Sequence, residues 1–159
     1  MRFLVTGAGG LIGANVSLTL AQRGHDIHAL DHFAVGRREN LADFKGTVHT
    51  GDIRDFDFAA LGRFDGVFHQ AAITDTTVMD EKLMRDVNVH AFVRILEAAH
   101  RTGTPKVVYA SSAATYGKGP VPNREDQTPA PANIYGVSKV EMEQAAKAFT
   151  DGHPAVQAV

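Results

Sequence analysis

The stretch NIYGVSKVEMEQ (residues 133–144) carries a tyrosine and a lysine four positions apart in a segment that favours a helix. Tyr135 and Lys139 therefore share one helix face, about 6 Å apart along the axis. A free phenol ionises with a pKa of about 10, and a cation about 4 Å away contributes up to about 4 kcal/mol at an effective dielectric of about 20. Such a lysine brings a phenol towards ionisation near neutral pH, so the pair predicts a base that removes a proton from an alcohol.

A hydroxyl that can hold the same alcohol oxygen comes from YASSAATYG (residues 109–117). Ser111 and Ser112 stand at the carboxyl end of the apolar run KVVYAS (106–111), which favours a strand. Proton removal by a tyrosine permits hydride transfer from the alcohol carbon to a nicotinamide. The three residue types therefore predict an oxidation–reduction site that needs a dinucleotide cofactor.

A glycine-rich segment, LVTGAGGLIGANV, follows the first apolar run and opens a helical pattern. In a dinucleotide loop of this kind, Gly7 permits a tight turn and Gly10 lets a pyrophosphate approach the backbone. Gly13 then lets the helix pack closely on the strand. The free N–H groups at the helix start favour phosphate. The segment predicts a site for the pyrophosphate of NAD or NADP.

The nucleotide preference depends on the residues after the second apolar run. Asp31 lies 18 residues after Gly13, where a carboxylate can accept hydrogen bonds from both ribose hydroxyls and repels a 2′-phosphate. This favours NAD. Arg37 and Arg38 follow in HFAVGRREN and can instead serve a phosphate, as NADP requires, or be solvated loop charges.

The wider pattern alternates short apolar runs with helical periods. Strands are predicted at 2–6, 26–31, 47–52, 66–71 and 106–111, and helices at 11–23, 56–62, 80–101 and 134–150. Buried parallel strands joined by right-handed crossovers predict a doubly wound, Rossmann-like α/β domain with its ligands at the carboxyl ends of the strands. Residues 119–133 form a predicted surface loop, and 153–159 resemble the start of a sixth strand at which the chain looks cut short.

Composition excludes several classes of function. The 159 residues carry a net charge of −2, which gives no electrostatic reason to expect nucleic acid or an anionic membrane as a partner. Without cysteine there is no disulfide, thiolate metal site or thiol nucleophile, and the eight histidines form no HExxH pattern, so no metal site is predicted. No signal peptide or apolar run of about 18 residues occurs, which predicts a cytoplasmic protein.

The chain resembles the N-terminal half of an extended short-chain dehydrogenase/reductase of the nucleotide-sugar epimerase type. The resemblance is carried by TGAGGLIG, GDIRD, FHQAA, the serine pair and YxxxK. The resemblance implies an NAD(P)-binding domain over 1–159 and a substrate-binding portion outside this sequence. It implies Ser112, Tyr135 and Lys139 as catalytic residues and Thr74, Ser112, Ala113 and Tyr135 as substrate contacts. The implied cofactor contacts are Gly7, Gly10, Leu11, Ile12, Gly13, Asp31, Arg37, Arg38, Asp52, Ile53, Gln70, Ala71, Ala72, Asn88, Ser111, Tyr135 and Lys139.

The same resemblance narrows the reaction. Sugar dehydratases of this type carry Asp-Glu after the catalytic hydroxyl, where this chain has Ala113 and Ala114, so transient oxidation followed by reduction at a sugar carbon is expected. Residues 74–88 and 109–117 resemble the ADP-glyceromanno-heptose 6-epimerases, whereas DHFAVGRREN looks more like the UDP-glucose 4-epimerases. A nucleotide-sugar reductase or dehydrogenase and a non-catalytic NAD(P)-binding module remain alternatives. A homodimer is expected through a four-helix bundle built from 80–101 and the helix that carries Tyr135.

Overall fold

The computed structural model describes all of residues 1–159 and contains one six-stranded sheet. All strand pairs are parallel, and the strand order is β3-β2-β1-β4-β5-β6. The strands are β1 (Arg2–Thr6), β2 (Asp26–Asp31), β3 (Thr47–Thr50), β4 (Gly66–His69), β5 (Lys106–Tyr109) and β6 (Gln157–Ala158). This order is that of the dinucleotide-binding doubly wound fold, so the predicted fold class is confirmed.

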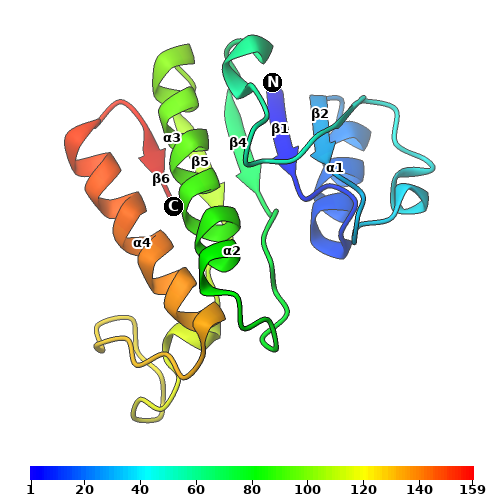
Figure 1. The fold of residues 1–159 in the computed structure, drawn as a ribbon. Helices are drawn as coiled ribbons and strands as arrows, with labels where there is room; N and C mark the ends of the chain where they lie inside the picture. The colour runs from blue at the N-terminus through cyan, green and yellow to red at the C-terminus, as the bar shows by residue number, and fades with distance from the viewer.

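Helices cover both faces of the sheet, because neighbouring residues of each strand point to opposite sides. In β1, Leu4 joins a large core with α3 (Ala91–Thr102) and α4 (Ile134–Gly152), whereas Val5 joins a second core with α1 (Leu11–Gln22). Figure 1 shows α3 and α4 side by side over the β4–β5–β6 half of the sheet. Burial on both faces explains why the strands read as continuous apolar runs.

The predicted helix over 80–101 is divided in the structure. It consists of α2 (Glu81–Arg85), a π-helical turn η3 (Asp86–His90) and α3. The predicted helix over 56–62 is only a 3₁₀ turn, η2 (Phe58–Leu61), capped by the Asp57 carboxylate. Two further 3₁₀ turns are η1 (Arg38–Leu41) and η4 (Ala113–Thr115). No helix has both the length and the apolar composition that crossing a bilayer requires.

Three predicted strands end two residues early in the structure. β3 stops at Thr50, β4 at His69 and β5 at Tyr109, because the chain leaves the sheet there to form loops. Thr6, His69 and Tyr109, the last residues of the three central strands, are in register with one another. The starts of α1 and α4 and the long 117–133 loop lie at the same edge, the lower one in Figure 1. The predicted sixth strand is present as β6, which pairs with β5.

Candidate functional site

Tyr135 and Lys139 lie in the first two turns of α4. The helix begins after Asn133, whose side-chain oxygen accepts a hydrogen bond from the Gly136 amide at 2.7 Å. Lys139 is buried; its Nζ donates to the Ala110 carbonyl at 2.7 Å and lies 5.8 Å from the centre of the Tyr135 ring. Burial lowers the pKa of Lys139 to about 8, and the negative charge of Glu143 opposes that shift. The amine is therefore still mainly protonated at neutral pH.

Gly136 and Ser138, the two poor helix formers between Tyr135 and Lys139, are explained by their contacts in the structure. A Cβ atom at Gly136 would lie 2.7 Å from the Ala114 carbonyl oxygen, so only glycine lets α4 pass this close to η4. Ser138 donates to the Tyr135 carbonyl at 2.7 Å and accepts from the Asn88 side chain at 3.0 Å. Both residues hold the tyrosine-bearing turn against the strand ends.

The serine pair follows β5 directly. The Ser112 hydroxyl accepts a hydrogen bond from the Ala114 amide at 3.1 Å and thereby starts η4. The Ser111 hydroxyl donates to the Glu143 carboxylate on α4. Ala113 is exposed beside them. Since Gly136 packs on η4 and Lys139 bonds Ala110, the structure brings the serine segment and the Tyr135–Lys139 pair to one edge of the sheet.

The glycine loop has the geometry expected of a phosphate site. Gly7 has φ = 68°, and a Cβ atom there would lie 2.6 Å from the Ala71 amide nitrogen. A Cβ atom at Gly13 would collide with the Gly7 backbone, which explains the close packing of α1 on β1. At Gly10 a Cβ atom would meet only the Gly7 oxygen, at 3.3 Å, so the space in front of Gly10 is open.

The start of α1 is an exposed apolar surface. Leu11 is 79% exposed and Ile12 is 62% exposed, although both are large hydrophobic residues. No side chain caps the helix at Gly10, so its first amide groups are without the usual side-chain acceptor. An open, uncapped helix start behind a glycine loop is suited to a phosphate with an apolar group beside it.

Asp31 ends β2 and is 8% exposed. One carboxylate oxygen accepts from the Gly9 amide at 2.9 Å, and the other accepts from the Phe33 amide at 2.7 Å. The Nδ1 atom of His32 also lies 3.3 Å from Oδ1, and since a carboxylate has about four acceptor positions, capacity remains for a ribose hydroxyl. The structure thus adds a second task to the predicted one, since Asp31 also ties the glycine loop to the segment after β2.

The two arginines after Asp31 are placed differently from each other. The backbone amide of Arg37 donates to the Gly9 carbonyl at 2.9 Å, and its side chain is exposed. Arg38 stacks on the Phe33 ring, with its guanidinium carbon 4.1 Å from the ring centre, and donates to the Thr50 hydroxyl at 2.9 Å. Arg38 is therefore engaged with protein groups, and its role as a phosphate ligand stays a prediction.

The remaining predicted cofactor residues lie along the loops after β3 and β4. Arg54 binds the Asp52 carboxylate, with Nη2 to Oδ2 at 2.6 Å, and this hydrogen bond holds the pKa of Asp52 below its ordinary value. Ile53 is buried in the large core. After β4, the Gln70 and Ala71 amides bond Thr6, at 3.1 and 3.3 Å, and carry the chain past Gly7 towards Ala72.

Asn88 lies in the π-helical turn and is buried. Its side chain exchanges two hydrogen bonds with the backbone of Ile73, at 2.8 and 3.0 Å, in addition to the bond to Ser138. Asn88 therefore joins the loop after β4 to α4. Thr74 follows in that loop and is exposed.

His69 is fully buried at the end of β4, stacked on Phe92 with 5.4 Å between the ring centres. Its Nδ1 lies 2.7 Å from the Thr6 hydroxyl, while Nε2 has no protein partner. Burial, with a smaller contribution from the charge of Lys139, lowers the pKa of His69 to about 3. His69 is thus a neutral side chain at neutral pH and packs behind the candidate site.

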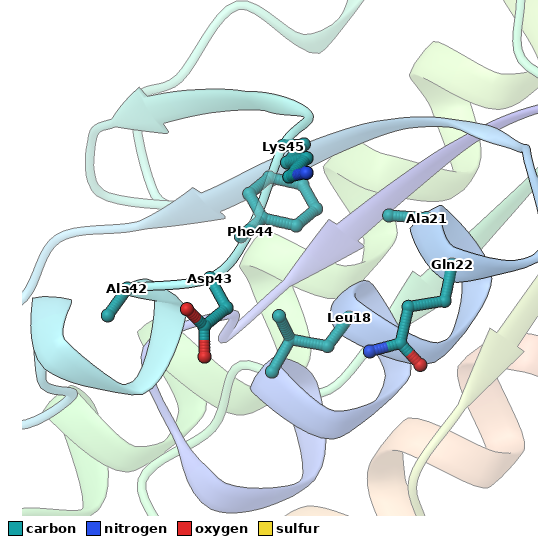
Figure 2. A pocket seen from close by; sticks show the side chains of 7 residues that line it. All are labelled: Leu18, Ala21, Gln22, Ala42, Asp43, Phe44 and Lys45. Atoms are coloured by element: carbon teal, nitrogen blue, oxygen red, sulfur yellow. The ribbon is translucent and has the colours of Figure 1, made fainter.

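A surface hollow of about 610 Å³ lies elsewhere. Figure 2 shows Leu18, Ala21 and Gln22 of α1 facing the segment of residues 42–45. The hollow contains none of the predicted site residues, and it lies along the later turns of α1, away from the glycine loop at that helix's start. It is not the place where Tyr135 and Lys139 would act.

Sequence reasoning missed several residues that shape the site. Glu143 bonds Ser111, Gly36 packs where a Cβ atom would lie 2.9 Å from Gly9, and Asn40 donates to the Gly9 carbonyl at 2.8 Å. The only sequence signal for Glu143 was its position one helical turn after Lys139. Gly36 and Asn40 lie in a polar loop where nothing in the pattern distinguishes them.

The chain is similar in sequence to proteins of one known family. Residues 3–159 match the sequence model of the NAD dependent epimerase/dehydratase family. A UDP-glucose 4-epimerase of Lacticaseibacillus casei is 34% identical over 151 residues, which cover 91% of this chain and 45% of that protein. The chain thus spans about half the length of the relatives that it matches.

Two solved structures extend the comparison. The Helicobacter pylori ADP-L-glycero-D-manno-heptose-6-epimerase superposes with a TM-score of 0.85 at 35% identity, covering 96% of this chain and 50% of that one. The Bacillus cereus UDP-glucuronic acid 4-epimerase, in complex with UDP-glucuronic acid and NAD, gives 0.90 at 25% identity, covering 100% and 55%.

Proposed function

The chain belongs to the NAD-dependent epimerase/dehydratase family, and from this premise we propose that it is the cofactor-binding part of a nucleotide-sugar epimerase. One observation carries the proposal. Lys139 is buried between Tyr135 and the Ala110 carbonyl, directly beside the serine segment and on the same sheet edge as the glycine loop. A buried cation costs stability, so its retention beside a phenol supports a chemical role.

The residues present fit NAD. The open space at Gly10 and the uncapped, exposed start of α1 suit the pyrophosphate, with Leu11, Ile12 and Gly13 beside it. Asp31 retains acceptor positions for the adenine ribose, and its charge disfavours a 2′-phosphate. We assign Asp52 and Ile53 to the adenine side and place 70–72 beside the cofactor next to Gly7. Ser111, Tyr135 and Lys139 are assigned to the nicotinamide ribose, and Asn88 acts by holding the Ile73 backbone.

The proposed chemistry is reversible oxidation of one sugar carbon. The chemistry that NAD supplies when bound is acceptance and return of a hydride. Tyr135 takes the proton of the sugar hydroxyl, and the positive charge of Lys139 favours the deprotonated phenol. The Ser112 hydroxyl holds the sugar oxygen, and Tyr135 returns the proton when the carbon is reduced from its other face.

The substrate proposed first is a UDP-hexose that is inverted at C4, since a UDP-glucose 4-epimerase is 34% identical to this chain. An ADP-heptose inverted at C6 is the second candidate, supported by the 35% identity to the Helicobacter pylori enzyme. Ala113 and Ala114 follow Ser112 and can donate or accept no side-chain proton, which disfavours elimination for either substrate.

A homodimer through a four-helix bundle built from 80–101 and α4 also remains a proposal. The outward side chains there include Arg94, Glu97, Arg101 and Lys147, all exposed. Three of these four side chains are positive, so a bundle between two copies would have to leave them at its solvated rim or pair them with carboxylates of the partner. Sedimentation at micromolar concentration tests this, and a monomer would contradict it.

The experiment that tests the function begins with calorimetric titration of the 159-residue chain with NAD and with NADP. We expect one NAD site, at least about tenfold tighter than NADP, a difference of about 1.4 kcal/mol. The full polypeptide that carries these residues should then interconvert UDP-glucose and UDP-galactose, or the two ADP-heptose epimers, without net NADH. Net NADH release would identify a dehydrogenase instead, and absence of nucleotide binding would overturn the proposal.

A further inference from the structure

Helix α4 contacts the segment after β5 at two consecutive residues. Lys139 Nζ donates to the carbonyl of Ala110 at 2.7 Å, and the carboxylate of Glu143 accepts from the hydroxyl of Ser111. Lys139 and Glu143 are one helical turn apart, so both side chains leave α4 on the same face. The lysine thereby holds the main chain at Ala110, and the glutamate holds the side chain of Ser111, immediately before Ser112.

The groups around Lys139 make Glu143 electrostatically important. Tyr135 and Glu143 face it from its own helix, His69 faces it from β4, and Tyr109 lies at the end of β5. His69 is neutral at pH 7, and so is the phenol of Tyr109, whose pKa burial raises further above its ordinary alkaline value. The negative charge that offsets the burial of Lys139 comes from Glu143.

We propose that Glu143 is a positioning residue of this site, which fixes the serine segment through Ser111 and keeps Lys139 positively charged beside Tyr135. The proposal deepens the proposed function and rests on it for its meaning. Glu143 makes no contact that would place it on a reacting atom; it acts only through Ser111 and Lys139. Without its charge, the lysine would lose part of its positive charge near neutral pH, where Tyr135 needs it.

The test measures the titration of Lys139 directly in the 159-residue chain, by NMR of protein made with ¹³C-labelled lysine. Lys139 is assigned from the signal that is missing in Lys139→Arg. In Glu143→Gln, which keeps an acceptor for Ser111 but removes the charge, we expect the pKa of Lys139 to fall by at least about half a pH unit. Glu143→Asp should restore part of the difference, and Glu97→Gln, an exposed charge change on α3, should leave Lys139 as it is.

An unchanged Lys139 titration in a folded Glu143→Gln protein would overturn the proposal. If that variant does not fold, the unmodified chain decides: the backbone amide signal of Ser111 should follow the titration of a carboxyl group, and a signal that stays flat between about pH 3 and 7 would overturn it as well. Neither measurement requires nucleotide. If the chain failed to bind NAD, the proposed function would be contradicted, but the effect of Glu143 on Lys139 and Ser111 could still be measured.

Discussion

Lys139 lies with its amine 5.8 Å from the centre of the Tyr135 ring, and the same amine is withdrawn from solvent onto the carbonyl of Ala110. The pair is therefore arranged at a cost to the folded state. The ordinary pKa of the lysine, 10.5, applies to the unfolded chain, and burial brings it to about 8 in the folded one. Below pH 8 the whole cost is present, and it fades as the pH rises from about 8 to above 10.5, because the unfolded chain holds the proton more tightly.

Replacing the charge by an apolar chain of similar length should relieve that cost. We expect Lys139→Met to be more stable than the original at pH 7, by about 1 to 2 kcal/mol after the lost hydrogen bond is subtracted. Thermal unfolding of both proteins at pH 7 and pH 10.5 measures this difference in stability, which should be smaller at the higher pH. A variant that melts below the original at pH 7 would show that the charge is not buried as described.

Gly136 should tolerate no side chain. In Gly136→Ala, the added Cβ atom would lie 2.7 Å from the Ala114 carbonyl oxygen, so α4 must move away from η4. We expect a loss of about 1 to 3 kcal/mol in the free energy of unfolding, with weaker NAD binding. The matched control is Gly152→Ala, at the last residue of the same helix, where a Cβ atom meets nothing within 4 Å. That variant should be neutral or stabilised, and equal losses in both would contradict the geometry.

Two glycines of the phosphate loop should differ in what they lose. Gly10→Ala should remain folded with a smaller loss of stability than Gly13→Ala, since its Cβ atom would make one tight contact, 3.3 Å from the Gly7 oxygen, but it should bind NAD at least about tenfold more weakly. Gly13→Ala places a Cβ atom 2.7 Å from the Gly7 carbonyl carbon and should lose stability by about 2 kcal/mol or more. Calorimetry and thermal melts separate the two effects. Gly10→Ala with full NAD affinity would argue against the pyrophosphate site.

The chain should lose stability in mild acid through His69. Its pKa is about 3 in the folded state against 6.5 ordinarily, so the unfolded chain takes up a proton as the pH falls below about 6.5. At pH 5 this costs the folded state up to about 2 kcal/mol. Burial also lowers the pKa values of His28 and His49, which act in the same direction.

Thermal melts at pH 7.5 and pH 5 of the original chain and of His69→Asn check this expectation. The asparagine keeps a polar partner for Thr6 but does not titrate, so the difference in melting temperature between pH 7.5 and pH 5 should become smaller. In His90→Asn, which changes an exposed histidine, the difference in melting temperature should stay as large as in the original chain. An unaltered difference in His69→Asn would mean that other groups cause the acid sensitivity.

The sequence was sufficient for the fold because its signals are local. Apolar runs, glycine spacing and helix periods specify the elements, and right-handed crossovers make a parallel sheet of such elements doubly wound. The order of the strands was not predicted and comes from the structure. Contacts between side chains that are far apart in the sequence could not be predicted from these local signals. The bond from Ser111 to Glu143 joins residues 32 positions apart, and its existence depends on how far α4 advances along β5.

The same limit explains two features that the sequence did not predict. The π-helical turn between Asp86 and His90 leaves no mark on the hydrophobic period, and it was predicted as continuous helix. The stacking of Arg38 on Phe33, a residue with φ = 57°, was not predicted either, and the phosphate role of Arg38 stays a prediction. A left-handed backbone at phenylalanine is not a pattern that sequence alone suggests.

The double engagement of Asp31 has a consequence for how this protein can evolve. Its carboxylate accepts hydrogen bonds from the amides of Gly9 and Phe33, so a substitution of Asp31 that removes the proposed ribose contact also removes the tie between two loops. A lineage that moved from NAD to NADP would have to acquire a replacement tie before, or together with, the loss of the acid. With the proposed role of Asp31, nucleotide preference and the arrangement of the two loops depend on the same carboxylate, so replacing this one residue changes both.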